Sequence, residues 1–274
     1  MTATVERPRA LADSAVHPVT LPRVLHGEWV KARSLRSTWL TLLVAVVAMI
    51  GIGCLIGWAT SNRWARLDPP ERAHFEPIIR SLAGVNLAQL AIVVLGVLLI
   101  SGEYATGMVR STFAAVPTRW PVLIAKVVLY AAITFVVSLA AALLAFLGGQ
   151  HFLGSHGTTL SAPHAVGSIV GVAGYLALIG VLAVGFGFIL RSTAGGISTL
   201  VGLLLVLPGI GQLLPSSWQE HTLPYLPSNA GGSMFTPRPE DPHALSAGAG
   251  LVVLCIWAAL SVAVAAVLLR RRDV

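Results

Sequence analysis

Residues 39–60 read WLTLLVAVVAMIGIGCLIGWAT, an apolar run without a charged side chain. A helix needs about 20 apolar residues to cross the hydrocarbon core of a bilayer. The run is too long for the core of a signal peptide and begins too far into the chain. We therefore predict that residues 39–60 form a transmembrane helix that the protein retains.

Five further apolar runs follow the first one. They cover residues 82–101, 122–147, 166–190, 197–214 and 248–269. Lipid offers no hydrogen-bond partner to the backbone, so only helices and closed barrels can span it. Strands of a barrel would alternate apolar and polar residues, and these runs do not alternate. The sequence therefore predicts an all-α integral membrane protein with six transmembrane helices.

The composition agrees with this fold class and excludes two others. Hydrophobic residues make up 55% of the chain and charged residues 11%, whereas a soluble domain carries about 25% charged residues. A disordered chain would also be rich in charge. The net charge of +7 comes from residues between the apolar runs rather than on one face of a folded domain. This distribution argues against a nucleic-acid partner.

The basic residues predict the orientation in the membrane. With six spans, both ends of the chain lie on the same side. If that side is the cytoplasm, it holds all but five of the 18 lysines and arginines, in line with the positive-inside rule. The five on the outer side are Arg63, Arg66, Arg72, Arg80 and Arg238. We predict a multi-pass protein of the cell membrane with both termini cytoplasmic.

Two segments precede the first span. Residues 1–21 are polar and predict a disordered cytoplasmic tail. Residues 22–38 predict an amphipathic helix on the inner leaflet of the bilayer, with a soluble linker helix as the alternative. On a helical wheel its apolar face comprises Leu25, Trp29, Ala32, Leu35 and Trp39. Lys31 and Arg33 flank this face, and Arg36 interrupts it with a stem long enough to reach the headgroups.

The connection between the second and third spans reads GEYATGMVRSTFAAVPTRWP over residues 102–121. Glu103 lies where the second span leaves the membrane, and Pro121 suits the first turn of the third span. A short connection with so few charges favours docking to another protein. A plain connector with a positive-inside arginine is the alternative.

The fifth run contains Pro208 and stops at Pro215. Proline is costly inside a helix, and residues 208–226 carry three prolines. This segment could enter and leave the outer leaflet as a re-entrant helix, or follow a kinked span as an ordinary loop. Both interpretations stay open.

The sequence lacks the usual motifs of catalysis. Neither Lys31 nor Lys126 follows a glycine, so there is no phosphate loop of the Walker A type, and no H-E-x-x-H or G-x-S-x-G motif occurs. Cys54 and Cys255 lack metal-ligand spacing, and the histidines are irregularly spaced. We expect no catalytic residue, no metal site and no cofactor bound by this chain.

The spans also contain almost no ionisable groups, which argues against a proton- or ion-coupled carrier. Lys126 lies close to the cytoplasmic edge of its span and is a poor candidate for such a role. Asn86 and Gln89 share one face of the second span, and they could pack helices together or line a pathway. The protein is therefore either passive or driven by a partner.

Three segments support a family resemblance. Residues 102–112, GEYATGMVRST, resemble the cytoplasmic loop of type-2 ABC exporter permeases. Residues 28–39, EWVKARSLRSTW, are similar to the interface helix and the start of the first span in that family. Residues 216–221 and 226–231 are similar to the extracellular region before the last helix in an actinobacterial-like branch of it.

The resemblance implies a permease domain over residues 22–274 that pairs with a second copy or a homologue. A separate ABC ATPase subunit would use ATP and Mg²⁺ and drive export of a substrate; the uncharged spans favour an amphiphilic or apolar one. Residues 103–119 would form the coupling loop that contacts the ATPase, with Glu103, Tyr104, Gly107, Arg110 and Arg119. The interface helix, which would also meet the ATPase, would include Glu28, Trp29, Lys31, Arg33 and Arg36. Pro208 and Pro215 would mark the break at the re-entrant segment. The rival is a passive channel, an ion-independent carrier or an accessory membrane regulator without an ATPase.

Overall fold

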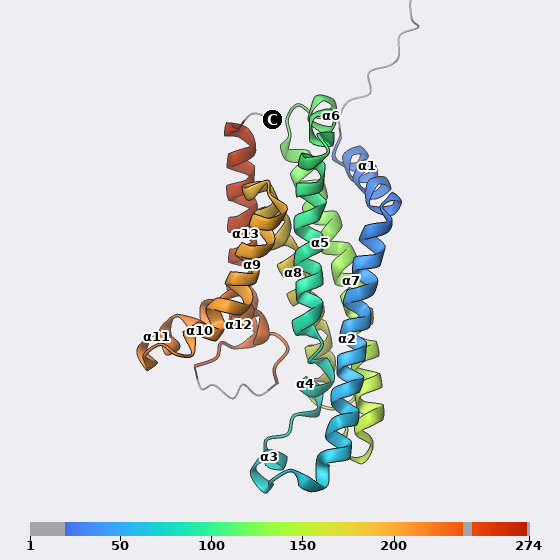
Figure 1. Cartoon of the computed structure of the whole chain (residues 1–274), viewed down its shortest axis with the longest axis vertical. Helices are drawn as coiled ribbons and strands as arrows, with labels where there is room; N and C mark the ends of the chain where they lie inside the picture. Colours follow the sequence, from blue (N-terminus) through green and yellow to red (C-terminus); the bar gives the residue numbers. More distant parts are fainter. Residues whose placement is uncertain (1–19, 238–242, 273–274) are drawn as a thin grey trace, which may run out of the picture.

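The computed structural model describes residues 20–237 and 243–272, so the predicted tail lies outside the described residues except for its last two. Every regular element in those ranges is a helix. The long helices run side by side, with α1 (Leu21–Ser34) and α6 (Met108–Ala115) at one end and α3 (Pro69–Ala73) at the other (Figure 1). We call these the α1 end and the α3 end.

The described residues include six helices that are long and apolar enough to cross a membrane. They are Arg36–Arg66, Pro77–Ala105, Trp120–His156, Ala165–Leu190, Thr193–Gly211 and Ala247–Arg271. This confirms the predicted all-α membrane fold. The helices extend past most of the apolar runs, because a helix can continue into the polar zone after its apolar stretch ends.

The outer helices expose large apolar side chains in the manner of a protein surrounded by lipid. On α2 (Arg36–Arg63), Leu43, Val47 and Leu55 are each more than half exposed. A soluble monomer rarely exposes so continuous an apolar surface. The fold is therefore that of a multi-pass membrane protein.

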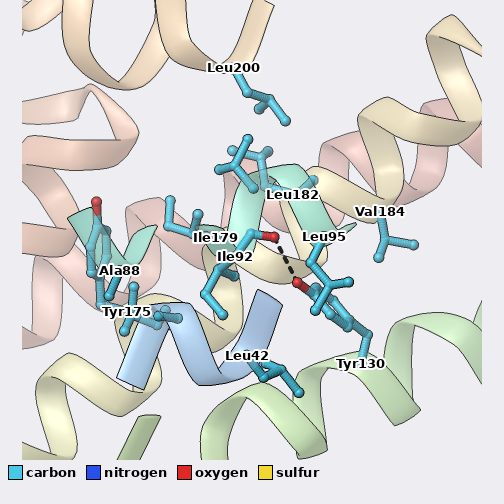
Figure 2. Close-up of a cluster of buried hydrophobic side chains, with 14 of the residues drawn as sticks. Leu42, Ala88, Ile92, Leu95, Tyr130, Tyr175, Ile179, Leu182, Val184 and Leu200 are labelled. Atoms are coloured by element: carbon cyan, nitrogen blue, oxygen red, sulfur yellow. Dashed lines mark hydrogen bonds between the residues drawn. The ribbon is translucent and has the colours of Figure 1, made fainter. Parts of the chain in front are cut away.

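The core forms around α8 (Ala165–Leu190), which packs against α5 (Val85–Ala105), α7 (Trp120–Leu153) and α13 (Ala247–Arg271). Small residues on α8 allow this close approach. A Cβ added at Gly180 would lie 2.9 Å from the Tyr130 ring of α7. The Tyr130 hydroxyl in turn donates a 2.7 Å hydrogen bond to the carbonyl oxygen of Ile92 on α5, so this buried polar group is satisfied (Figure 2).

The predicted helix over residues 22–38 is wrong in extent. α1 ends at Ser34, Leu35 is extended with φ −86° and ψ 106°, and α2 begins at Arg36. Leu35 and Trp39 therefore do not share a face with the apolar residues of α1. The buried residues of α1 are Glu28 and Ala32, because the helix packs against α7 with a carboxylate directed inward.

The fifth span begins earlier than the predicted residue 197, at Thr193, and ends earlier than the predicted residue 214, at Gly211. It begins as α9 (Thr193–Val201), widens into the π-helical turn η3 (Gly202–Val206) and continues as α10 (Leu207–Gly211). Pro208 has no N–H to donate, and its ring would clash with the carbonyl of Leu204 in a regular α-helix. The wider π turn relieves this conflict.

The segment after the break returns alongside the middle of the bundle. Figure 1 shows α10 and α11 (Ser216–His221) projecting sideways and α12 (Pro227–Gly232) beside α13. Trp257 donates a 3.0 Å hydrogen bond to the carbonyl oxygen of Tyr225, and Trp257 lies about 15 Å along α13 from its first residue. Of the two interpretations left open for residues 208–226, the packing favours the re-entrant one.

Candidate functional site

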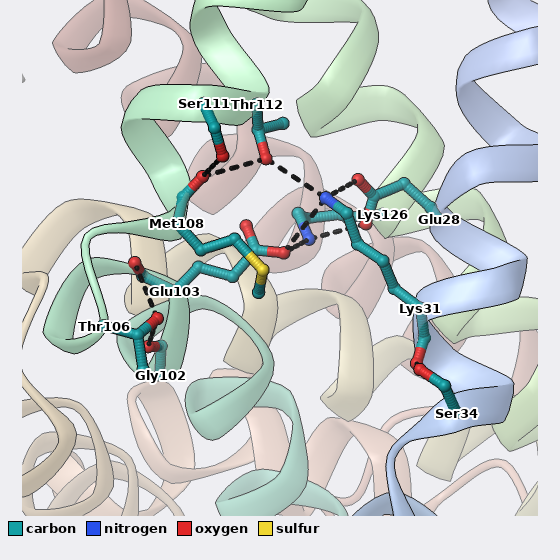
Figure 3. Close-up of polar contacts among 10 residues, drawn as sticks. All are labelled: Glu28, Lys31, Ser34, Gly102, Glu103, Thr106, Met108, Ser111, Thr112 and Lys126. Carbon is teal, nitrogen blue, oxygen red and sulfur yellow. Dashed lines mark hydrogen bonds and ion pairs between the residues drawn. The ribbon is translucent and has the colours of Figure 1, made fainter.

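Four charged side chains meet inside the α1 end of the bundle (Figure 3). Glu28 and Lys31 come from α1, Glu103 from the last turn of α5 and Lys126 from the first part of α7. We call these four residues the ionic cluster. Helical spacing places Glu28 and Lys31 on adjacent turns of α1, so both can reach the same neighbours.

Lys126 is the centre of the ionic cluster. Its Nζ lies 2.6 Å from Oε2 of Glu28 and 2.7 Å from Oε1 of Glu103. Lys31 closes the ring from outside, with Nζ 2.8 Å from Oε1 of Glu28 and 3.3 Å from Oε1 of Glu103. Two ammonium groups thus alternate with two carboxylates, and the charges of the four groups cancel.

The charges of the ionic cluster need partners because the cluster is largely buried. The side chain of Lys126 is 2% exposed, whereas that of Lys31 is 32% exposed. An isolated charge in such a site carries a desolvation penalty of several kcal/mol, which a well-placed opposite charge offsets. The ionic cluster is therefore an interlocked unit in which no buried charge stands alone.

The pKa of Lys31, at the partly exposed edge of the ionic cluster, reflects the same ion pairs. Partial burial alone would lower its pKa, but hydrogen bonds and charge attraction from Glu28 and Glu103 outweigh burial, and the pKa of Lys31 is raised above its ordinary value of 10.5. The side chain therefore keeps its positive charge at neutral pH, and the ring stays closed.

The ionic cluster also reaches α6, the helix of the predicted coupling loop. Lys31 Nζ donates a 3.1 Å hydrogen bond to the Thr112 hydroxyl, which donates to the carbonyl oxygen of Met108 at 3.2 Å. Gly107 lies between α5 and α6 with φ +73°, a left-handed conformation that favours glycine. This turn brings α6 back over Glu103.

Two arginines link residues 103–119, the predicted coupling loop, to α13 and to the end of α8. Arg119 Nη1 donates to the carbonyl oxygens of Leu269 at 3.1 Å and Arg272 at 3.2 Å, at the C-terminal end of α13. The guanidinium carbon of Arg191, just after α8, lies 4.8 Å from the centre of the Tyr104 ring. Residues 103–119 therefore contact α1, α7, Arg191 after α8 and the end of α13 through hydrogen bonds, ion pairs and a cation–π contact.

The remaining predicted coupling and interface residues face outward. Arg110 is exposed on α6, beside exposed Ser111 and Met108, and its side chain forms no hydrogen bond or ion pair with the described residues. Trp29 and Arg33 are exposed on α1, and Arg36 belongs to α2 instead. The structure thus divides the predicted set into a buried cluster and an exposed surface around it.

Asn86 and Gln89 differ in solvent exposure. Gln89 is buried and accepts a hydrogen bond from the Tyr175 hydroxyl of α8, so it serves helix packing. Asn86 is exposed on α5. Pro208 lies in α10, directly after the π turn, and Pro215 precedes α11, beyond the end of the fifth span at Gly211.

Sequence reasoning missed the role of Lys126. It treated this lysine as an edge charge, yet the side chain pairs with a carboxylate 98 residues away. One signal was available, since an ionisable group inside an otherwise uncharged run indicates a functional or paired site. The described residues contain no group of three or more His, Cys, Asp and Glu side chains that could hold a metal ion.

Comparison with known proteins adds no family assignment. No protein-family model matches the chain, and no curated protein is similar to it in sequence. The six apolar helices indicate a membrane protein of the transport type.

Proposed function

We propose that this chain is the membrane-spanning permease subunit of an ATP-driven exporter of the type-2 ABC class. One observation carries the proposal. The ionic cluster joins α1 to the α5–α6–α7 connection, and these are the two segments through which the resemblance implies contact with an ATPase. The shared ion pairs make α1 and the α5–α6–α7 connection one structural unit, as contact of both segments with a single ATPase would require.

The ionic cluster suggests how force would pass from a partner into the spans. A partner that moves α6 or α1 would pull on Thr112, Lys31 and Glu28. Separating these groups from Glu103 and Lys126 would expose buried charges without partners, which is costly. The ends of α5 and α7 would therefore move with the surface helices rather than slide past them.

The exposed face of α6 is the proposed docking surface for the ATPase. Arg110, Ser111 and Met108 all face away from the bundle. We place this end of the molecule, with both termini, in the cytoplasm of a cell-membrane protein, following the distribution of lysine and arginine. The ATPase subunit would bind ATP and Mg²⁺, and this chain would hydrolyse nothing itself.

The transport pathway would lie between this chain and a second copy or a homologue. Asn86, exposed on α5 among apolar neighbours, is a candidate lining residue. The spans offer few charges to a passing molecule, which favours an amphiphilic or apolar substrate.

A site-specific photo-crosslinker tests the docking surface. With the crosslinker in place of Arg110, we expect the membrane-embedded full chain to capture a nucleotide-binding subunit with a Walker A loop, identified by mass spectrometry. The matched control carries the crosslinker in place of Leu55, which is 59% exposed on the lipid-facing part of α2, and it should capture lipid alone. Capture of lipid alone, or of a protein without a nucleotide site, at position 110 would contradict the proposal.

A further inference from the structure

A second polar site lies at the α3 end, far from the ionic cluster. A pocket of about 510 Å³ forms between the end of α2, the short helix α3 and α4 (Pro77–Leu82). Arg63 of α2 and Arg80 of α4 line it together with Ile56, Ala59 and Phe75. The lining thus combines cationic and apolar side chains.

The two arginines have no partner of their own. Both are exposed, and neither guanidinium group forms a hydrogen bond or ion pair with any residue that the structure describes. The carboxylate in the lining, Glu71, accepts a 3.3 Å hydrogen bond from the backbone N–H of Asp68 in the capping box of α3. Two guanidinium groups from different helices therefore face one open space, an arrangement that suits a phosphate oxygen pair.

The pocket lining contributed by α2 changes from apolar to cationic along the helix. Ile56, Ala59 and Arg63 lie three and four residues apart, so they follow one another along a single face of the helix. The apolar run ends at residue 60, which puts Arg63 in the zone where headgroups begin. An occupant would meet Ile56 and Ala59 nearer the membrane interior and Arg63 nearer the water, while Arg80 lines the same pocket from α4.

Residues 64–75, which lie between α2 and α4 and include part of the pocket lining, are fixed by side-chain contacts. The Trp64 ring stacks on His156 with centroids 3.9 Å apart, and it meets the Phe75 ring edge-on at 5.1 Å. Arg72 donates a 3.0 Å hydrogen bond to the carbonyl oxygen of Ala65. The lining residue Phe75 is therefore fixed by contacts outside the pocket.

We propose that this pocket binds an anionic phospholipid, with the phosphate between Arg63 and Arg80 and an acyl chain against Ile56 and Ala59. The charge of the arginines selects an anion, and the apolar lining selects one that carries a hydrocarbon chain. The site requires only that the chain lies in a membrane, and it is independent of the proposed exporter function.

Lipid retention by the full-length protein in nanodiscs tests the site. Nanodiscs contain phosphatidylglycerol and phosphatidylcholine in equal amounts, and native mass spectrometry counts the lipids that remain bound. The wild-type protein should prefer phosphatidylglycerol. Arg63→Gln and Arg80→Gln should each lower its retention about fivefold, as expected from about 1 kcal/mol for each arginine near a membrane surface.

The matched control is Arg66→Gln, which removes the same charge from an exposed residue three positions from Arg63 that does not line the pocket. It should retain phosphatidylglycerol like the wild type. An equal loss in this control, or no preference in the wild type, would show unspecific surface charge and overturn the proposal.

Ala59→Phe tests the apolar part, because it fills space while both arginines stay. It should lower phosphatidylglycerol retention, and the water-soluble headgroup glycerol phosphate should bind only weakly to the wild type. If glycerol phosphate competes as well as the phospholipid, or Ala59→Phe has no effect, the pocket is a simple anion site and the lipid assignment is wrong.

Discussion

At the scale of single residues, Lys126 shows how a charge is tolerated inside an apolar bundle. Its Nζ has a carboxylate on either side, from α1 and α5. Each carboxylate has a second ammonium in Lys31. The arrangement satisfies all four groups, and removing any buried member leaves another charge without enough partners.

Replacement of Lys126 by methionine should therefore destabilise the protein strongly. We expect a loss of about 3–5 kcal/mol in the free energy of unfolding, since two buried carboxylates would depend on Lys31 alone. Chemical unfolding in detergent, followed by tryptophan fluorescence, measures the loss.

Two variants serve as controls for this prediction. Lys31→Met removes the same charge at a more exposed position and should cost clearly less than Lys126→Met, because water can replace part of what is lost. The double variant Lys126→Met/Glu103→Gln should recover part of the loss, since it leaves fewer unpaired charges. Equal losses in the two single variants would contradict the interlocked cluster.

At the scale of elements, the six spans could be predicted from sequence and the contacts among them could not. Apolar length is a local property, so each span was visible in its own residues. The burial of Glu28 on α1 depends on its pairing with Lys126, which lies 98 residues away. Residues 103–119 were singled out by their motif, but the attachment of this segment to α13 through Arg119 joins residues 150 positions apart.

This attachment gives a prediction for the end of α13. Arg119 donates to the carbonyl oxygen of Leu269 in the last turn of α13, where helix carbonyls lack partners within the helix, and to that of Arg272 just after it. Arg119→Gln should let the last turn fray, and amide hydrogen exchange of residues 268–271 should become about tenfold faster or more, since a hydrogen bond from a charged group contributes about 1.5–3 kcal/mol.

The control for Arg119→Gln is Arg110→Gln in the same loop. The side chain of Arg110 forms no hydrogen bond with the described residues, so this variant should leave exchange at the end of α13 unchanged. If both variants behave alike, the cap on α13 is not what holds this end of the helix.

At the scale of the whole molecule, the two ends of the bundle carry different polar chemistry. The α1 end holds the balanced, buried ionic cluster beneath the exposed face of α6 (Figure 3). The α3 end holds unpaired, exposed arginines beside an apolar surface. Between them, the spans offer apolar packing around α8. We infer that one end receives mechanical input and the other contacts lipid headgroups.

The most direct test of this division is transport by reconstituted vesicles. The purified chain is inserted alone, or together with the ATPase captured at α6, and accumulation of a fluorescent amphiphile is followed with and without Mg-ATP. We predict accumulation against a gradient only when both polypeptides and Mg-ATP are present. Accumulation against the gradient by this chain alone would contradict the central claim that a separate ATPase drives it.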